Sequence, residues 1–81
     1  MELKRIKIVR TEQEVKGKKM TEFIRETQPD EEALFVCANA SELDNATQTA
    51  YAVKDEKRED GFKYKVSRST KKMRVVVSLT K

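Results

Sequence analysis

The sequence predicts a single two-layer α+β domain spanning residues 1–81. Three observations lead to this prediction. Stretches near both ends alternate between apolar and polar residues, a continuous apolar run occupies the middle, and two segments with helical periodicity lie between them. We therefore expect the order β-α-β-α-β-β, with both helices packed against a small mixed sheet of four strands. The last two strands form a basic C-terminal β-hairpin.

Composition limits the size of the core. Charged residues make up 40% of the chain and hydrophobic residues 37%, which is polar for a folded domain, so a second subunit could supplement the core.

The charge is segregated along the chain. Residues 1–25, 26–60 and 61–81 carry net charges of +4, −7 and +7, and we expect the molecule to be a strong dipole.

The same composition indicates a cytoplasmic protein. One cysteine allows no intrachain disulfide, which is typical of a reducing compartment. No signal peptide is visible at the start of the sequence. No stretch approaches the roughly 20 apolar residues that a membrane span needs, so no membrane partner is expected.

The first quarter of the chain predicts a strand and then a helix. Residues 3–9 alternate between apolar and basic side chains, which favours a strand with one basic face. Residues 11–14 match a capping box, with Thr11 as the N-cap, and predict a helix over residues 12–26. Gly17 weakens this helix by about 1 kcal/mol relative to alanine. In the alternative, the helix begins only near Lys18, after a loop.

The middle of the chain predicts a central strand and a second helix. Pro29 ends the first helix, and residues 33–38 form an unbroken apolar run that is typical of a strand covered on both faces. If both helices lie on one face, the other face stays open unless a second subunit or another partner covers it. Ser41 is the predicted N-cap of the second helix, which ends at Gly61. Its core stripe should consist of Leu43, Ala46, Ala50 and Val53.

Residues 62–80 predict the hairpin, because they alternate on both sides of a short polar break. With a loop at residues 68–71, Val66 lies opposite Met73. The same register sets Lys65 opposite Arg74 on the other face, and like charges directly across a ladder are destabilising. The predicted apolar face contains Phe62, Tyr64, Val66, Met73, Val75, Val77 and Leu79.

Catalytic chemistry is poorly supplied, so we predict no enzyme, no cofactor and no metal site. The chain has no histidine, the usual acid–base group near neutral pH. Cys37 lies in the apolar run, where burial would raise the pKa of its thiol and leave it inert. The acidic residues 30–32 follow a proline in a predicted loop, where adjacent carboxylates are typically solvated.

The basic hairpin is the best functional signal. The leading hypothesis is a small nucleic-acid-binding domain, with DNA favoured over RNA, whose hairpin contacts the phosphate backbone. The polar face of the second helix could read bases through Asn45 and Gln48. The hairpin cations proposed to contact phosphate are Lys63, Lys65, Arg68, Lys71, Lys72 and Arg74.

Two alternatives to nucleic-acid binding remain open. The hairpin lysines could simply keep an edge strand soluble. The chain could instead be a protein-interaction module or inhibitor, encoded by a phage or mobile element, that docks through its acidic middle or a sheet edge. A homodimer is compatible with either function.

Overall fold

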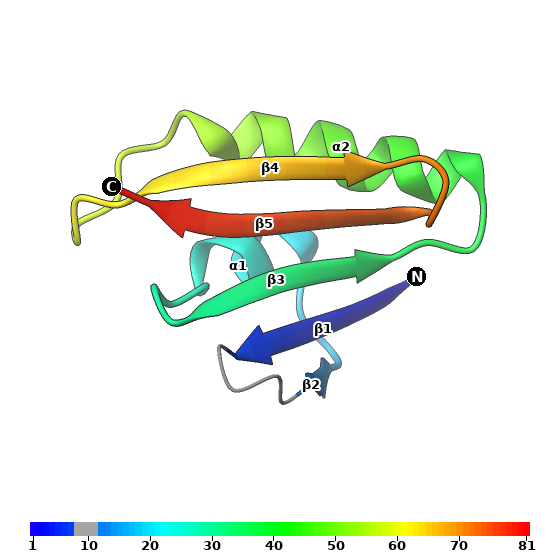
Figure 1. Cartoon of the computed structure of the whole chain (residues 1–81), viewed down its shortest axis with the longest axis horizontal. Helices are drawn as coiled ribbons and strands as arrows, with labels where there is room; N and C mark the ends of the chain where they lie inside the picture. Colours follow the sequence, from blue (N-terminus) through cyan, green and yellow to red (C-terminus); the bar gives the residue numbers. More distant parts are fainter. Residues whose placement is uncertain (8–11) are drawn as a thin grey trace.

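The computed structural model describes residues 1–7 and 12–81, and it confirms a small two-layer α+β domain (Figure 1). The predicted N-cap Thr11, and residues 8–9 of the first predicted strand, lie outside the described residues. The elements are β1 (Glu2–Lys7), β2 (Glu12–Val15), α1 (Met20–Arg25), β3 (Glu31–Val36), α2 (Ala40–Lys54), β4 (Lys63–Ser69) and β5 (Arg74–Thr80).

The sheet has five strands in the order β2-β1-β3-β5-β4, and every neighbouring pair is antiparallel. The predicted mixed sheet of four strands was wrong for two reasons. The additional strand β2 reverses the chain once more before β3, so β3 runs antiparallel to β1. The connection from β3 through α2 to β4 does join strands of the same direction, but β5 lies between them and pairs with both.

The segment predicted as one helix over residues 12–26 contains a strand and a shorter helix. Residues 12–15 pair with β1 and place Val15 opposite Leu3, where both side chains pack against the core. Pairing with β1 and partial burial of Val15 therefore outweigh the helix signal of the capping box. Gly17 has a φ of 76°, a left-handed conformation that suits glycine, in the turn that leads to α1. The alternative prediction, in which the helix begins only near Lys18, is closer to the structure, since α1 begins at Met20.

The hairpin forms with the predicted apolar face but in a different register. The turn occupies residues 70–73, with Met73 in a left-handed conformation (φ 54°), so Val66 pairs with Val77 and not with Met73. A shift of four residues keeps every side chain on its predicted face, because the strand period is two. Arg74 lies opposite Ser69, which removes the predicted repulsion between Arg74 and Lys65.

The core lies between the two helices and one face of the sheet (Figure 1). As predicted, β3 is the central strand, and the ring of Phe35 meets Phe23 of α1 edge-on at 5.3 Å between centroids. The N-cap of α2 is Asn39, two residues before the predicted Ser41, and its Oδ1 accepts a hydrogen bond from Glu42. The four residues of the predicted stripe are all buried: Leu43, Ala46, Ala50 and Val53.

Candidate nucleic-acid interface

The alternation of β4 divides the hairpin cations between the two faces of the sheet. We call the face without helices the open face; Figure 1 shows it in front of α1 and α2. Tyr64 of β4 is buried in the core, so Lys63 and Lys65 project from the open face. Arg68 lies four residues after Tyr64 on the same strand, so its side chain projects from the same, helix-covered side of the sheet.

Arg68 is therefore not part of the surface that the sequence predicted for it. Its Nη2 lies 3.1 Å from Oδ1 of Asp44 on α2, and its Nη1 donates to Oγ1 of Thr47 at 3.4 Å. This pair links β4 to α2. A guanidinium already engaged by a carboxylate is a poor candidate for a phosphate contact.

Five other cations of the hairpin form no ion pair with the residues that the structure describes. Lys63 and Lys65 lie along β4, Arg74 begins β5, and the exposed Lys71 and Lys72 occupy the turn. Ser67 and Ser69 lie between them on the same face. We call this set the basic stripe: Lys63, Lys65, Ser67, Ser69, Lys71, Lys72 and Arg74.

A shallow hollow joins the turn end of the basic stripe to the centre of the open face. Its volume is about 260 Å³, and Lys72 and Arg74 line it together with two serine hydroxyls and an apolar part. The apolar part consists of Ile6, Leu34 and Val76, one residue from each of β1, β3 and β5. Cations, hydroxyl donors and apolar surface therefore meet at one place.

The other predicted site residues lie on a different side of the molecule. Asn45 and Gln48 are exposed on α2, whose core stripe packs against the opposite face of the sheet. The helix layer therefore separates them from the basic stripe. One flat ligand cannot contact both sets, so the structure does not bring the predicted backbone and base contacts together.

The acidic middle of the chain carries less free charge than the sequence suggests. Six of the ten acids in residues 26–60 form ion pairs, whereas Arg68 alone does so among the seven bases of residues 61–81, all of which the structure describes. Unpaired cations are therefore denser in residues 61–81 than unpaired acids are in residues 26–60. The paired acids are Glu26, Glu31, Glu42, Asp44, Glu56 and Asp60.

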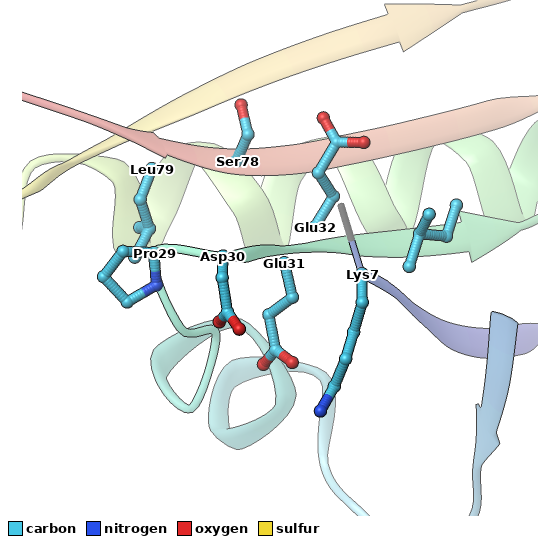
Figure 2. Close-up of a pocket in the computed structure, with 8 residues that line it drawn as sticks. Lys7, Pro29, Asp30, Glu31, Glu32, Ser78 and Leu79 are labelled. Carbon is cyan, nitrogen blue, oxygen red and sulfur yellow. The ribbon is translucent and has the colours of Figure 1, made fainter. Parts of the chain in front are cut away.

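The acidic run at the start of β3 does not form one cluster. Figure 2 shows Asp30 and Glu31 directed to one side of the sheet and Glu32 to the other. Glu31 is turned inward, where its carboxylate lies 3.7 Å from Nε of Arg5 and accepts a hydrogen bond from the backbone of Gln28. Strand alternation therefore separates the carboxylate of Glu32 from those of Asp30 and Glu31.

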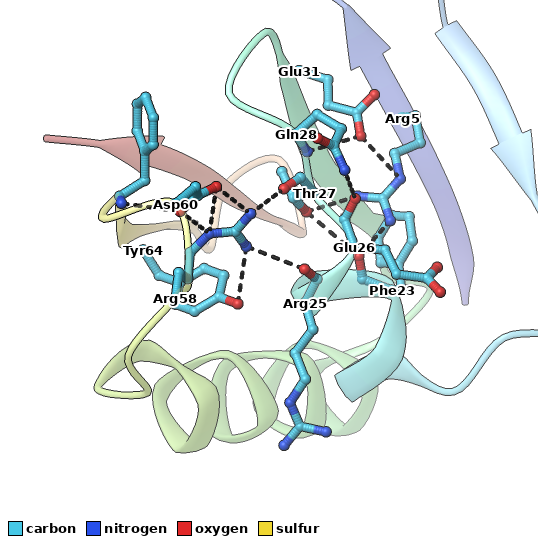
Figure 3. Close-up of polar contacts among 11 residues, drawn as sticks. Arg5, Phe23, Arg25, Glu26, Thr27, Gln28, Glu31, Arg58, Asp60 and Tyr64 are labelled. Atoms are coloured by element: carbon cyan, nitrogen blue, oxygen red, sulfur yellow. Dashed lines mark hydrogen bonds and ion pairs between the residues drawn. The ribbon is translucent and has the colours of Figure 1, made fainter.

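Sequence reasoning missed two arginines that organise the helix side (Figure 3). Arg5 is only 8% exposed. It stacks 4.2 Å from the ring centroid of Phe23 and donates to Oγ1 of Thr27 at 2.7 Å and to the backbone oxygen of Phe23. Burial lowers the pKa of the Arg5 guanidinium, and the carboxylate of Glu31 opposes this shift. The alternating pattern of β1 predicted Arg5 on a solvent face, so no sequence signal indicated its burial.

Arg58, the second arginine, lies beyond the end of α2 and satisfies carbonyl groups at the end of α1. It donates to the backbone oxygens of Arg25 at 3.1 Å and Thr27 at 2.8 Å, and to the hydroxyl of Tyr64 at 3.0 Å. Its bond to the Asp60 carboxylate raises the pKa of Arg58 and lowers the pKa of Asp60. A cation at a helix C-terminus is favourable, so both arginines have structural roles.

Cys37 is buried after β3, and desolvation raises the pKa of its thiol, as predicted.

Within the described residues, α2 is the longer helix and still lacks the length and apolar character that crossing a bilayer requires.

No family model, curated protein or solved structure matches this chain.

Proposed function

We propose that this protein binds the phosphate backbone of nucleic acid along the basic stripe, with duplex DNA as the first target. The single observation that carries the proposal is the contrast in free charge. Five hairpin cations on the stripe have no ion pair among the described residues, while most acids of the middle segment are neutralised within the chain.

The geometry of β4 suits a polyanion. Residues two apart on a strand project from the same face at intervals of about 6.7 Å, so Lys63, Lys65, Ser67 and Ser69 present a row of donors along one edge of the sheet. Lysine and serine side chains are common donors to phosphate oxygens. Arg74 can add a bidentate contact at the turn end of the row.

The proposed contact is with the backbone and not with base edges. Phosphate contacts position a protein but carry no direct sequence information. Because Asn45 and Gln48 lie on the far side of the helix layer, we assign them no role at the same ligand. Binding should therefore be weakly dependent on sequence and strongly dependent on salt.

Fluorescence anisotropy with labelled duplex DNA, single-stranded DNA and RNA, over a range of salt concentrations, tests the proposal. Each lost phosphate contact should reduce the slope of log K against log salt by roughly 0.9 on duplex DNA. Lys65→Ala should show this reduction. The matched control is Arg68→Ala on the same strand, which should keep the wild-type slope because Arg68 faces Asp44.

Two results would reject this proposal. The first is the absence of binding to all three polymers at low salt. The second is an equal loss of slope in the Lys65→Ala and Arg68→Ala variants, because it would show that binding depends on total charge and not on the basic stripe. Circular dichroism should confirm that both variants stay folded.

A further inference from the structure

The open face has an apolar centre that no helix covers. Four apolar side chains gather there from β1, β3 and β5: Ile6, Leu34, Val36 and Val76. Leu34 is 2% exposed, but the other three are only half-buried. The register places Leu34 opposite Val76, so the apolar surface is continuous across the middle of the sheet.

The charges around this centre are segregated by strand. Glu2 of β1 and Glu12 and Glu14 of β2 share the open face with one lysine, Lys4, which lies 3.7 Å from both Glu2 and Glu12. On the opposite side of the same face, the charged residues that the structure describes are all cations: Lys63 and Lys65 of β4 and Arg74 of β5. The face is thus acidic at β2 and basic at β4.

We propose that a second copy of this chain covers the open face, related by a two-fold axis that runs parallel to the strands. A two-fold interface brings the same surface of both subunits together, so the surface must complement itself. An axis parallel to the strands sets the β2–β1 side of one copy over the β5–β4 side of the other. An axis across the strands would set acid over acid and base over base, which is unfavourable.

The register indicates where this axis lies. An axis between β3 and β5 sets Leu34 opposite Val76 of the second copy and Glu32 opposite Ser78. It also brings Glu12 next to Lys65, because Glu12 is the β2 neighbour of Ile6 and Lys65 is the β4 neighbour of Ser78. Leu34 and Val76 of the two copies then meet at the spacing of about 10 Å that is usual for packed sheets. The same axis sets Ile6 opposite Lys65 and Val36 opposite Arg74, whose aliphatic stems can cover these two apolar side chains.

A second copy fits the whole face better than a polyanion does. Nucleic acid satisfies the basic side but would meet the carboxylates of Glu12, Glu14 and Glu32, and it leaves the apolar centre uncovered. A second copy covers the apolar centre and brings acidic residues of one copy near cations of the other. One consequence rests on the proposed function: Lys63, Lys65 and Arg74 serve both surfaces, so nucleic acid and a second copy should exclude each other.

Sedimentation velocity over a concentration series, without nucleic acid, tests this inference through a charge exchange. Lys65→Glu alone and Glu12→Lys alone should each raise the dimer dissociation constant by at least about tenfold, because each homodimer would contain two like-charge contacts. An equimolar mixture of the two variants should restore association, since both contacts in the mixed dimer are again between opposite charges. Asp55→Lys, on the exposed end of α2, should leave the dimer unchanged.

A wild-type protein that stays monomeric at low salt up to millimolar concentration would overturn the inference, and so would a mixture that fails to associate. The anisotropy titrations separate this outcome from failure of the proposed function. If the charge-exchanged variants form a dimer but the protein binds no nucleic acid, the dimer is supported and the proposed function is rejected. If the protein is a monomer that binds nucleic acid with the predicted salt slopes, the proposed function is supported and the dimer is rejected.

Discussion

Replacing the buried Arg5 by methionine should be among the most destabilising single changes in this domain. The side chain is 8% exposed, and its guanidinium bonds to Thr27 and the backbone of Phe23 while facing Glu31. Methionine keeps much of the packing but leaves the largely buried carboxylate of Glu31 without its cation. Breaking one side of a buried ion pair costs about 3–5 kcal/mol. An 81-residue domain has a total stability of about 4–12 kcal/mol.

A double-mutant cycle separates the charge effect from the packing effect. Glu31→Gln also breaks the ion pair, but Arg5 keeps its hydrogen bonds to Thr27 and the backbone of Phe23, so this single change should cost less than Arg5→Met. The new amide oxygen can still accept the backbone hydrogen bond from Gln28. Combined with Arg5→Met, Glu31→Gln removes both charges, and the double variant should be more stable than Arg5→Met alone by at least about 1 kcal/mol.

Urea denaturation followed by far-ultraviolet circular dichroism measures all four free energies of unfolding. A loss of less than about 1 kcal/mol for Arg5→Met would show that Arg5 is not paired in the core. Additive effects of the two substitutions would equally show that Glu31 does not depend on Arg5.

Three further predictions concern α2, the Arg58 contact and the turn before β4. Ala50→Asp should destabilise the fold by at least about 3 kcal/mol because it buries a charge. Gln48 is exposed, so Gln48→Ala should change the free energy of unfolding by less than about 0.5 kcal/mol. Equal losses of stability in urea would show that the buried face of α2 is assigned wrongly. The lowered pKa of Asp60 means that its pairing with Arg58 stabilises the fold above the ordinary carboxyl pKa of about 4, and that this contribution is lost as pH falls through the folded-state value. Asp60→Asn should therefore flatten the loss of stability measured between about pH 5 and pH 2. Gly61→Ala should cost about 1 kcal/mol through backbone strain alone, since φ is 78° and an added Cβ would meet no atom within 4 Å. An unchanged melting temperature would count against the left-handed conformation of Gly61.

The fold class could be predicted because burial patterns dominate it. The apolar run around Phe35 and the stripe that includes Ala50 both occupy the positions that their periodicity indicated. The strand β2 could not be predicted, because its four residues have a single apolar side chain, Val15, and gain their place only by pairing with β1. The hairpin register depends on a turn that holds Met73 in an uncommon left-handed conformation, which alternation alone cannot reveal.

The candidate site was predictable in composition but not in arrangement. Alternation correctly put Lys63 and Lys65 on the face away from the core. It could not show that Arg68 turns toward Asp44, because that pairing depends on how α2 lies along β4. For the same reason, the position of Gln48 on the far side of the molecule required the layer order, which is a property of the tertiary structure.

Backbone amide chemical shifts, recorded during titration with a short DNA duplex at low salt, give the most direct test of phosphate binding along the basic stripe. We expect the largest changes on residues 63–74, at Lys65 and its neighbours on the basic stripe, and we expect them to disappear as salt is raised. Amides around Gln48 should stay nearly unchanged. Changes centred on α2, or no changes even at the highest concentration of duplex, would show that the basic stripe does not bind DNA.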